Sequence, residues 1–322
     1  MRRRLFLHSG SAAAILALTA CGGGGGGGSS LASDSLTGVT AAERGPEPAP
    51  TTPATSTLPD KVLACYYTGW DTGTYKITDV PAEFNVIYLF HAKPNGTPVN
   101  GNWNNVGDGS FFFEFYADVT RAQVQTCRQR GQKVMLTVGG ASAGFNFNTR
   151  AKSENFVKSF QSMYDQLGGV DGCDFNNFEA NIGSSSDEMI WISRQLKAIY
   201  GDGFAITAPP QPNSAEDRAM LKAMSDAGVL TWCGPQYYDW SGFNEPGFIR
   251  NRTKDWVNDL GERKVMLGLS ANYSNGPTLQ DCIREWDAVK ADYPNIRGMF
   301  CWSAQLNLAG GNAWGQAAKA QM

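Results

Sequence analysis

The stretch GVDGCDFNNFEA, residues 169–180, combines the apolar character of a buried strand with acids and amides. Its Val, Cys and Phe residues suit a core strand, yet it also carries Asp171, Asp174 and Glu179. Removing such groups from water is costly unless they are paired or used. Carboxylates crowded near the end of a buried strand suit general acid catalysis, because burial and neighbouring negative charge raise the pKa of one of them. We therefore interpret the stretch as a candidate active-site strand, and a strand running into a polar loop is the alternative.

Seven further apolar runs flank this stretch between Lys61 and Met322. They are VLACYY (62–67), NVIYLFHA (85–92), KVMLTVGG (133–140), FAITAPP (204–210), TWCGPQYY (231–238), KVMLGLSA (264–271) and GMFCWSA (298–304). Such nearly continuous apolar strands are typical of a parallel sheet covered on both faces. Amphipathic helical patterns separate most of them, as in residues 153–167, where Phe156, Phe160 and Tyr164 recur at a spacing of four.

Eight strands with crossover helices in about 250 residues predict a single α/β domain, a (β/α)8 TIM barrel. A doubly wound open sheet is the alternative. No glycine-rich phosphate loop of the expected spacing follows any of the runs, which argues against a nucleotide-binding open sheet.

The first sixty residues indicate an export signal and a tether. Residues 1–20 have a basic start, a short apolar run and small residues, which are typical of a signal peptide. Leu18-Thr19-Ala20-Cys21 resembles a bacterial lipobox, which implies lipidation of Cys21. Arg3-Arg4-Leu5-Phe6-Leu7 resembles a twin-arginine signal, with Sec export as the alternative. Residues 21–60, rich in Gly, Ser, Thr and Pro, predict a flexible tether. We expect residues 61–322 to form the catalytic domain, lipid-anchored in the bacterial cell envelope, at the outer membrane, or secreted.

Composition narrows the classes of partner and chemistry. The chain has 322 residues and a formal net charge of -3, without a basic stripe, which argues against nucleic acid as a partner. Of its two histidines only His91 lies in the body, which argues against a Ser-His-Asp triad or a His-rich metal site. We expect no metal or cofactor, a monomer, and membrane contact only through the lipid anchor. Scattered cysteines indicate core packing, and a disulfide between Cys65 and Cys301 is an open alternative.

The residues at the ends of the predicted strands share one chemical character. In a (β/α)8 barrel the chemistry lies at the C-terminal ends of the strands. The side chains and backbone expected there are Tyr66, Phe90, Gly140, Asn177, Glu179, Gln236, Tyr238, Asp239 and Trp302. Aromatic faces beside amides and carboxylates are the usual surroundings of a bound carbohydrate, so we expect these residues to line a sugar-binding cleft.

At these motifs the body of the chain, residues 61 to 315, resembles a glycoside hydrolase family 18 chitinase of the bacterial chitinase D-like group. KVMLTVGG is similar to the family's third-strand motif, DGCDFNNFE (171–179) to its fourth-strand motif Asp-Gly-x-Asp-x-Asp-x-Glu, and QYYD (236–239) to its sixth-strand motif. The resemblance implies retaining, substrate-assisted hydrolysis of β-1,4-linked N-acetylglucosamine, in which the substrate's own N-acetyl group attacks the anomeric carbon.

The resemblance also implies roles for individual residues. Glu179 would be the proton donor, Asn177 would orient the acetamide, and Asp174 would belong to the same motif. Tyr238 would donate to the acetamide oxygen, Asp239 would line that subsite, and Trp302 would stack beneath the sugar. The other residues expected to contact substrate are Tyr66, Phe90, Gly140 and Gln236.

The fourth-strand motif departs from the family pattern in two ways. Asn177 stands where the family has Asp, and a lost charge at a developing ion is commonly worth ~3 kcal/mol. Asp174 lies five residues before Glu179 instead of four, which on a regular strand turns it to the opposite face. We predict that a β-bulge near Phe175–Asn176 returns Asp174 to the face of Glu179. The alternative is a regular strand, in which Phe175 points inward and Asp174 takes no part in the reaction.

These departures leave two function hypotheses. The first is an active hydrolase, either a chitinase or an endo-β-N-acetylglucosaminidase that uses an Asn-x-Glu pair. The second is a catalytically weak or inactive barrel that binds chito-oligosaccharides or other glycans. The retained Glu179 and Tyr238 favour the hydrolase, whereas Asn177 and the extra residue favour the binding barrel.

Overall fold

The computed structural model describes residues 57–70, 74–115, 119–176, 183–239 and 242–322. The predicted signal peptide (1–20), Cys21 and nearly all of the predicted tether (21–60) lie outside these ranges. Asn177 and Glu179 of the fourth-strand motif also lie outside them.

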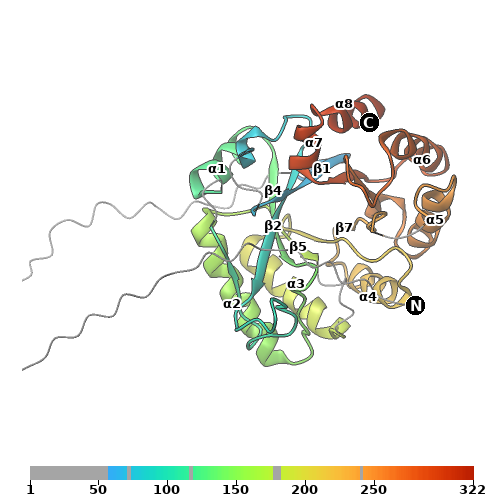
Figure 1. Ribbon diagram of the computed structural model, residues 1–322. Coiled ribbons are helices and arrows are strands. Elements are labelled where there is room, and N and C mark those ends of the chain that lie inside the picture. The colour runs from blue at the N-terminus through green and yellow to red at the C-terminus, as the bar shows by residue number, and fades with distance from the viewer. Residues whose placement is uncertain (1–56, 71–73, 116–118, 177–182, 240–241) are drawn as a thin grey trace, which may run out of the picture. The chain divides into compact units, whose positions relative to one another are not determined.

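Eight parallel strands form the centre of the body (Figure 1). They are β1 (Val62–Thr68), β2 (Val86–Pro94), β4 (Lys133–Gly139), β5 (Gly172–Asn176), β6 (Ala205–Ala208), β7 (Trp232–Cys233), β8 (Met266–Ser270) and β9 (Gly298–Trp302). Each falls within one of the eight apolar runs or extends it by one or two residues.

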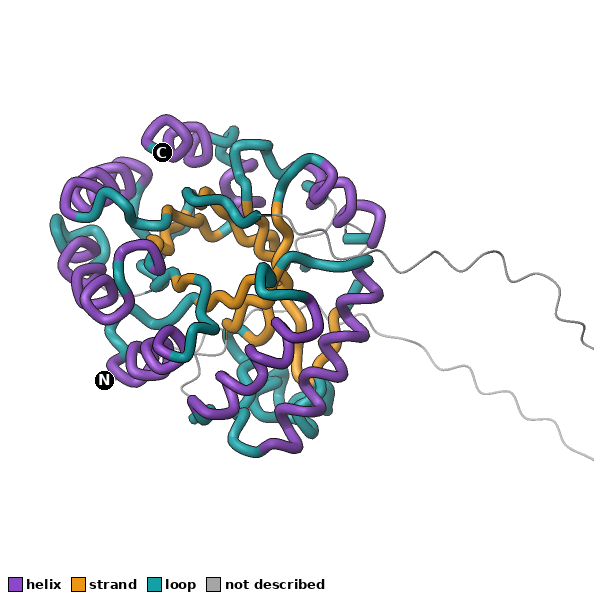
Figure 2. The backbone as a smooth tube through the Cα atoms, turned by 180° about the vertical axis from the view of Figure 1, so that it is seen from behind, coloured by secondary structure: helices purple, strands orange, loops and turns teal. Residues whose placement is uncertain are grey.

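The sheet closes on itself. Its order is β7-β6-β5-β4-β2-β1-β9-β8, and parallel bridges between Cys233 and Val265 and between Gln236 and Gly268 join the two ends. Figure 2 shows the strands as a ring with the helices outside it. Strand β7 is short because Pro235 has no N–H to give to the ladder. The closed ring confirms the (β/α)8 barrel and excludes the open doubly wound sheet.

Helices cover the outside of the ring. They are α1 (Arg121–Gln129), α2 (Arg150–Leu167), α3 (Ser186–Tyr200), α4 (Ala215–Asp226), α5 (Phe248–Leu260), α6 (Leu279–Asp292), α7 (Ala304–Ala309) and α8 (Ala313–Gln321), with 3-10 turns η1 (Ile77–Asp79) and η2 (Glu262–Lys264). Local sequence sets several of their ends. Thr120 and Thr278 begin α1 and α6 with capping boxes, and Gly168 ends α2 at φ 74°. Within the described ranges, none of these helices has the length and hydropathy needed to cross a membrane.

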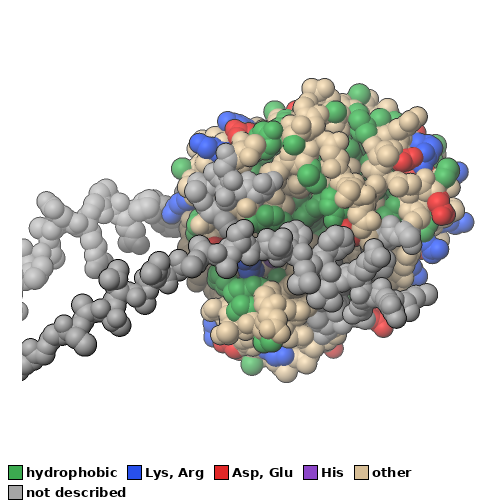
Figure 3. Space-filling view, viewed as in Figure 1, with side chains coloured by type: hydrophobic (Ala, Val, Ile, Leu, Met, Phe, Trp, Pro, Cys, Tyr) green, Lys and Arg blue, Asp and Glu red, His purple; other side chains and the backbone are tan. Residues whose placement is uncertain are grey.

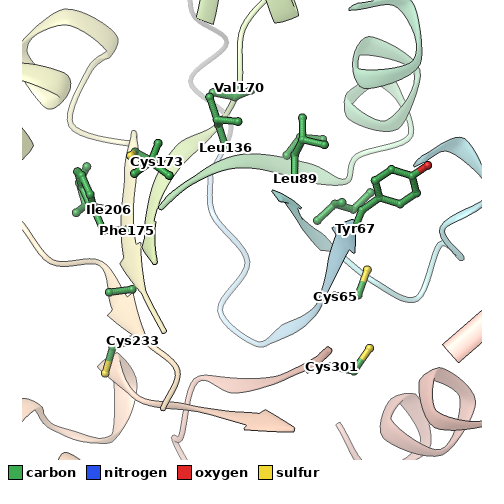
Figure 4. Packing of buried hydrophobic residues seen from close by; sticks show 14 of the residues in the cluster. Cys65, Tyr67, Leu89, Leu136, Val170, Cys173, Phe175, Ile206, Cys233 and Cys301 are labelled. Carbon is green, nitrogen blue, oxygen red and sulfur yellow. The ribbon is translucent and has the colours of Figure 1, made fainter. Parts of the chain in front are cut away.

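The strands bury two different faces. The outward face packs against the helices through the larger apolar cluster, which includes Leu89, Leu136 and Phe175 (Figure 4). Cys65 and Cys301 also point outward as partners in the β1–β9 ladder, and both are free thiols, so the possible disulfide is not formed. The inward face forms a second cluster that is rich in aromatic rings. The two faces therefore separate packing against helices from the lining of the barrel.

One element has no counterpart among the predicted strands. Strand β3 (Phe111–Phe113) runs antiparallel to the end of β2 and pairs Ala92 with Phe113 and Pro94 with Phe111. The apolar pattern of three consecutive phenylalanines is too short to distinguish a strand from a loop. The resulting two-stranded extension, which we call the β2–β3 ribbon, carries the insertion of residues 95–110.

Candidate active site

Asp174 points into the barrel and is held by three hydroxyl groups. Tyr66 and Thr137 donate to its Oδ2 at 2.8 and 2.9 Å, and Thr207 donates to its Oδ1 at 2.7 Å. The side chain is 1% exposed. Burial raises its pKa to about 6, although the three hydrogen bonds act in the opposite direction. The four strands β1, β4, β5 and β6 therefore meet at one carboxyl group.

Strand β5 is regular through its last residue. Asp174 pairs with Thr137, Phe175 with Val138, and Asn176 with Gly139. Side chains alternate, so Phe175 points outward against Phe156 of α2, with ring centroids 5.7 Å apart, while Asp174 faces inward. The predicted bulge is therefore wrong as far as Asn176. The residues between Asn176 and Glu179, which would have to take up the extra position, lie outside the described ranges. Packing on α2 fixes Phe175 on the outward face of β5. Because neighbouring side chains on a strand alternate between faces, Asp174 then points into the barrel without a bulge.

The alternation also places Asn176 on the same side as Asp174. Asn176 is 2% exposed, and its Oδ1 atom has no hydrogen-bond partner among the residues that the structure describes. Buried amide oxygens nearly always have a partner, so a lone one calls for an explanation. Sequence analysis missed Asn176 because the spacing was counted back from Glu179. Counting forward in steps of two from Asp174 would have found it.

The bulge lies on β2 instead. The β2–β4 register pairs Leu89 with Leu136 and then Ala92 with Val138, so that Phe90 and His91 together oppose a single residue of β4. The two consecutive rings stack with centroids 4.1 Å apart and planes within 7°. Gly140 permits this arrangement, because a Cβ there would lie 2.5 Å from the Phe90 ring.

His91 is a buried, neutral member of this bulge. Its Nδ1 forms a hydrogen bond with the carbonyl oxygen of Gly139, so Nδ1 must carry the proton. The ring is 7% exposed, and burial lowers its pKa to about 4. A neutral imidazole with this tautomer has a lone pair at Nε2. A single histidine within an apolar run gives no sign of a bulge, so the stacking of His91 on Phe90 is not predictable from the sequence.

Trp302 lies at the centre of a group of rings at the end of β9. Its centroid is 5.1 Å from that of Phe90, 5.6 Å from Tyr66, and 6.3 Å from both Tyr238 and Trp70. Trp302 is half-buried and Trp70 is 50% exposed, so both present ring surface to solvent. On the face shown in Figure 3, hydrophobic side chains gather near the middle and charged ones lie mainly toward the edge.

The segment after β7 supplies polar side chains beside these aromatic rings. Tyr238 donates from its hydroxyl to Gln236 Oε1 at 2.6 Å, and Gln236 donates from Nε2 to the carbonyl oxygen of Pro209 at 2.7 Å. Asp239 is exposed and has a left-handed backbone, with φ 63°. Its Oδ1 accepts hydrogen bonds from Tyr273 Oη at 2.7 Å and Asn275 Nδ2 at 2.9 Å. The loop after β8 therefore fixes Asp239 at the mouth of the barrel.

Most of the residues predicted from the strand ends do come together. Ring contacts join Tyr66, Phe90, Tyr238 and Trp302, while hydrogen bonds add Asp174 and Gln236. Gly140 borders the Phe90 ring, and Asp239 follows Tyr238 directly. In the ranges that the structure describes, no three His, Cys, Asp or Glu side chains are grouped as metal ligands would be. The arrangement combines an aromatic surface with an unpaired amide acceptor and a buried carboxyl group.

Comparison with known proteins shows similarity to chitinases. No family model matches the chain. It is similar to Exochitinase 1 of Streptomyces olivaceoviridis, with 24% identity over 163 residues, which span 44% of this chain and 26% of the relative. It is also similar to Endochitinase 2 of Metarhizium anisopliae, with 21% identity over 266 residues, 68% of this chain and 62% of the relative. The chain thus spans less than two thirds of the length of either relative.

Solved structures give the fold. A family GH18 chitinase from Chromobacterium violaceum superposes with a TM-score of 0.68 at 19% identity, covering 83% of this chain and 85% of that one. The fold is that of the GH18 chitinases. A fungal endo-β-N-acetylglucosaminidase of GH18 has a TM-score of 0.63 at 16% identity, covering 81% and 98%. A xylanase-α-amylase inhibitor protein, XAIP-I, has the same TM-score at 14% identity and the same coverage. The GH18-like fold therefore occurs in glycosidases and in inhibitor proteins.

Proposed function

We propose that this protein is a glycoside hydrolase that cleaves β-1,4-linked N-acetylglucosamine chains by substrate-assisted catalysis with retention of configuration. The acetamide oxygen of the substrate attacks the anomeric carbon, and the glycosidic C–O bond breaks as Glu179 gives its proton to the leaving oxygen. Water then opens the resulting oxazolinium ion, with Glu179 as the base. Glu179 has this role through its place in the sequence motif, since it lies outside the described residues.

The observation that carries the proposal is the Oδ1 of Asn176, which lies in an aromatic barrel mouth and has no hydrogen-bond partner within the described part of the chain. A substrate-assisted reaction needs an acceptor that orients the acetamide N–H, and a buried oxygen without a partner gains a hydrogen bond when that group arrives. The sequence prediction gave this role to Asn177. The regular alternation of β5 favours Asn176, which lies two residues after Asp174 on the inward face.

Asp174 supplies the charge that an asparagine lacks. Above pH 6 its carboxyl group is mostly ionised, since its pKa is about 6. A negative charge in a buried environment stabilises the developing positive charge at the anomeric carbon more strongly than it would in water. Tyr238 would turn its single hydroxyl hydrogen from Gln236 Oε1 to the acetamide oxygen. Asp239 would accept a substrate N–H or O–H, and Trp302 would stack under the reacting sugar.

The test is hydrolysis of a fluorogenic chitobioside by the wild type and by Glu179→Gln. We expect turnover by the wild type and a loss of at least about a hundredfold in the variant, in the range found when a general acid is removed. Absence of turnover by the wild type, together with measurable binding of chito-oligosaccharide, would rule out the hydrolase. Parallel assays on chitin oligomers and on N-linked glycans separate a chitinase from an endo-β-N-acetylglucosaminidase.

A binding barrel with weak or absent catalysis is the second candidate. The amides at positions 176 and 177 favour it, because neither bears the charge that the family motif supplies at this point. The shared fold of the inhibitor protein XAIP-I is consistent with it. Such a barrel would bind chito-oligosaccharide with equal affinity in the wild type and in Glu179→Gln, and neither would turn it over.

We also propose that the protein is exported, lipid-anchored through Cys21 at the cell envelope, and monomeric. The lipobox-like Leu18-Thr19-Ala20-Cys21 supports the anchor. Fractionation of cells that express the wild type or Cys21→Ala tests it. The wild type should stay with the membrane fraction and the variant should leave it, whereas equal distribution would contradict the anchor.

A further inference from the structure

The β2–β3 ribbon has two unlike faces. On one face, Phe111 and Phe113 are buried against the α2 side of the core, where Phe111 lies 5.3 Å from Phe156 between ring centroids. On the other face, Lys93 and Phe112 are cross-strand partners, and both are half-buried. Side chains of cross-strand partners project from the same side of a ribbon. The second face is therefore left partly open to solvent.

Trp103 of the insertion covers part of this open face. Its ring centroid lies 5.6 Å from that of Phe112, and the Lys93 ammonium lies 5.6 Å from the ring centroid. Trp103 is itself half-buried, so part of its ring remains accessible. We call Lys93, Trp103 and Phe112 the ribbon strip. Its composition, two aromatic rings beside one ammonium group, matches the mixed apolar and hydroxyl surface of a sugar.

The insertion is fastened to the barrel mouth. Trp103 N donates to Ser142 O at 2.7 Å, and Asn105 N donates to Gly144 O at 2.9 Å. The side-chain oxygen of Asn104 accepts from Gly144 N at 2.8 Å. Residues 142–144 follow directly on the end of β4. The strip is thus held in a fixed place relative to the candidate active site.

The strip continues the aromatic group around Trp302. Trp70 lies 6.3 Å from Trp302 and 5.8 Å from His91, measured between ring centroids. His91 and Lys93 are two residues apart on β2, and Ala92 between them faces the helices. His91 and Lys93 therefore share the inward and upper face of the strand. Ring contacts therefore lead from Trp302 through Trp70 to His91, and Lys93 of the ribbon strip follows two residues later on the same face of β2.

We propose that the ribbon strip is a distal subsite that binds further N-acetylglucosamine units of a chain whose reacting sugar lies over Trp302. This inference rests on the proposed function and adds a preference for long chains. Trp103 and Phe112 would cover the C–H face of a sugar ring. The Lys93 ammonium, which has three N–H groups and uses one on Glu114 at 3.3 Å, would donate to a hydroxyl or acetamide oxygen.

The experiment compares Trp103→Ala with the wild type on a fluorogenic chitobioside and on chitohexaose. If the strip binds sugars beyond the first two, the chitobioside does not use it, and we expect the KM for the chitobioside to stay within about twofold. The KM for chitohexaose should rise at least about tenfold, as is typical when a central aromatic contact is removed. Val99→Ala, at a position that is 67% exposed on the same insertion, is the matched control and should leave both substrates unchanged.

Lys93→Met is a second test of the proposed subsite, and it is needed if Trp103→Ala unfolds. It should also raise the KM for chitohexaose selectively, while the melting temperature stays near that of the wild type. Equal effects on the two substrates, or none on chitohexaose, would overturn the subsite. If the wild type hydrolyses neither substrate, the proposed function fails, and calorimetric binding of chitohexaose and chitobiose by the same variants then decides the subsite alone.

Discussion

Strands β5 and β2 flank β4 in the barrel, and they deliver side chains to the mouth in opposite ways. Strand β5 is regular and places every second side chain inside, from Asp174 to Asn176. Strand β2 is bulged and brings two consecutive rings, Phe90 and His91, to the same region. The prediction put the irregularity in β5, where the polar residues are crowded. The comparison teaches that polar crowding does not mark a bulge, because packing of the outward side chains on the helices sets the register.

The largest test of this comparison removes the outward anchor of β5. Phe175→Ala deletes a ring that is fully buried against α2 and should lower the free energy of unfolding by about 3–5 kcal/mol. Urea denaturation measures the loss. Phe115→Ala, at a position that is 44% exposed, is the control and should cost far less. Similar losses in both variants would show that Phe175 does not anchor the strand.

The next test concerns β2 and uses His91→Phe. The buried histidine has its pKa lowered from 6.5 to about 4, so the unfolded chain takes up a proton before the folded one as the pH falls. Stability conferred by the neutral ring is complete above pH 6.5 and is lost as the pH falls toward 4. Relative to His91→Phe, which keeps the stacked ring, the wild type should lose about 3 kcal/mol over that range. Parallel pH curves for the two proteins would contradict the buried neutral histidine.

Asp174→Asn tests β5 and should give the opposite sign. The pKa of Asp174 is raised from 3.8 to about 6, so the folded protein holds its proton to a higher pH than the unfolded chain. Stability associated with the protonated form is present below pH 3.8 and is lost as the pH rises through 6. The wild type should therefore lose about 3 kcal/mol relative to Asp174→Asn between these values. Asp217→Asn is the control, since Asp217 has a similarly raised pKa on α4, away from the barrel interior.

The last test distinguishes the two neighbouring asparagines by the rate of hydrolysis, and it has the smallest expected change in free energy. Restoring a charge at the position that faces the acetamide should raise the rate of chitobioside hydrolysis by about two orders of magnitude. The regular register of β5 assigns that gain to Asn176→Asp and little change to Asn177→Asp. The reverse result would return the acetamide-orienting role to Asn177. Both variants are compared at pH 7, with the binding of chitobiose measured alongside.

The barrel could be predicted from the sequence because strands that are buried on both faces are apolar along their whole length, and eight such runs are present. Strand β3 escaped detection because three phenylalanines carry no period. For the site, the aromatic and amide residues at the strand ends were found, since barrel topology brings those ends together. Asn176 was missed because the spacing was counted back from Glu179. The bulge at Phe90–His91 was missed because it depends on pairing with β4, which no single run of sequence records.

The hydroxyl groups around Asp174 determine how that carboxyl group can gain a proton. Tyr66 and Thr137 both donate to Oδ2, whereas Thr207 alone serves Oδ1. Thr207 Oγ1 also lies 4.0 Å from the sulfur of Met135, a weak acceptor. When Oδ1 is protonated, it can donate a hydrogen bond to Thr207 Oγ1, provided that the hydroxyl hydrogen of Thr207 turns toward the Met135 sulfur. The contacts around Oδ1 thus allow the carboxyl group to be held in either charge state, with only the Thr207 hydroxyl hydrogen changing direction.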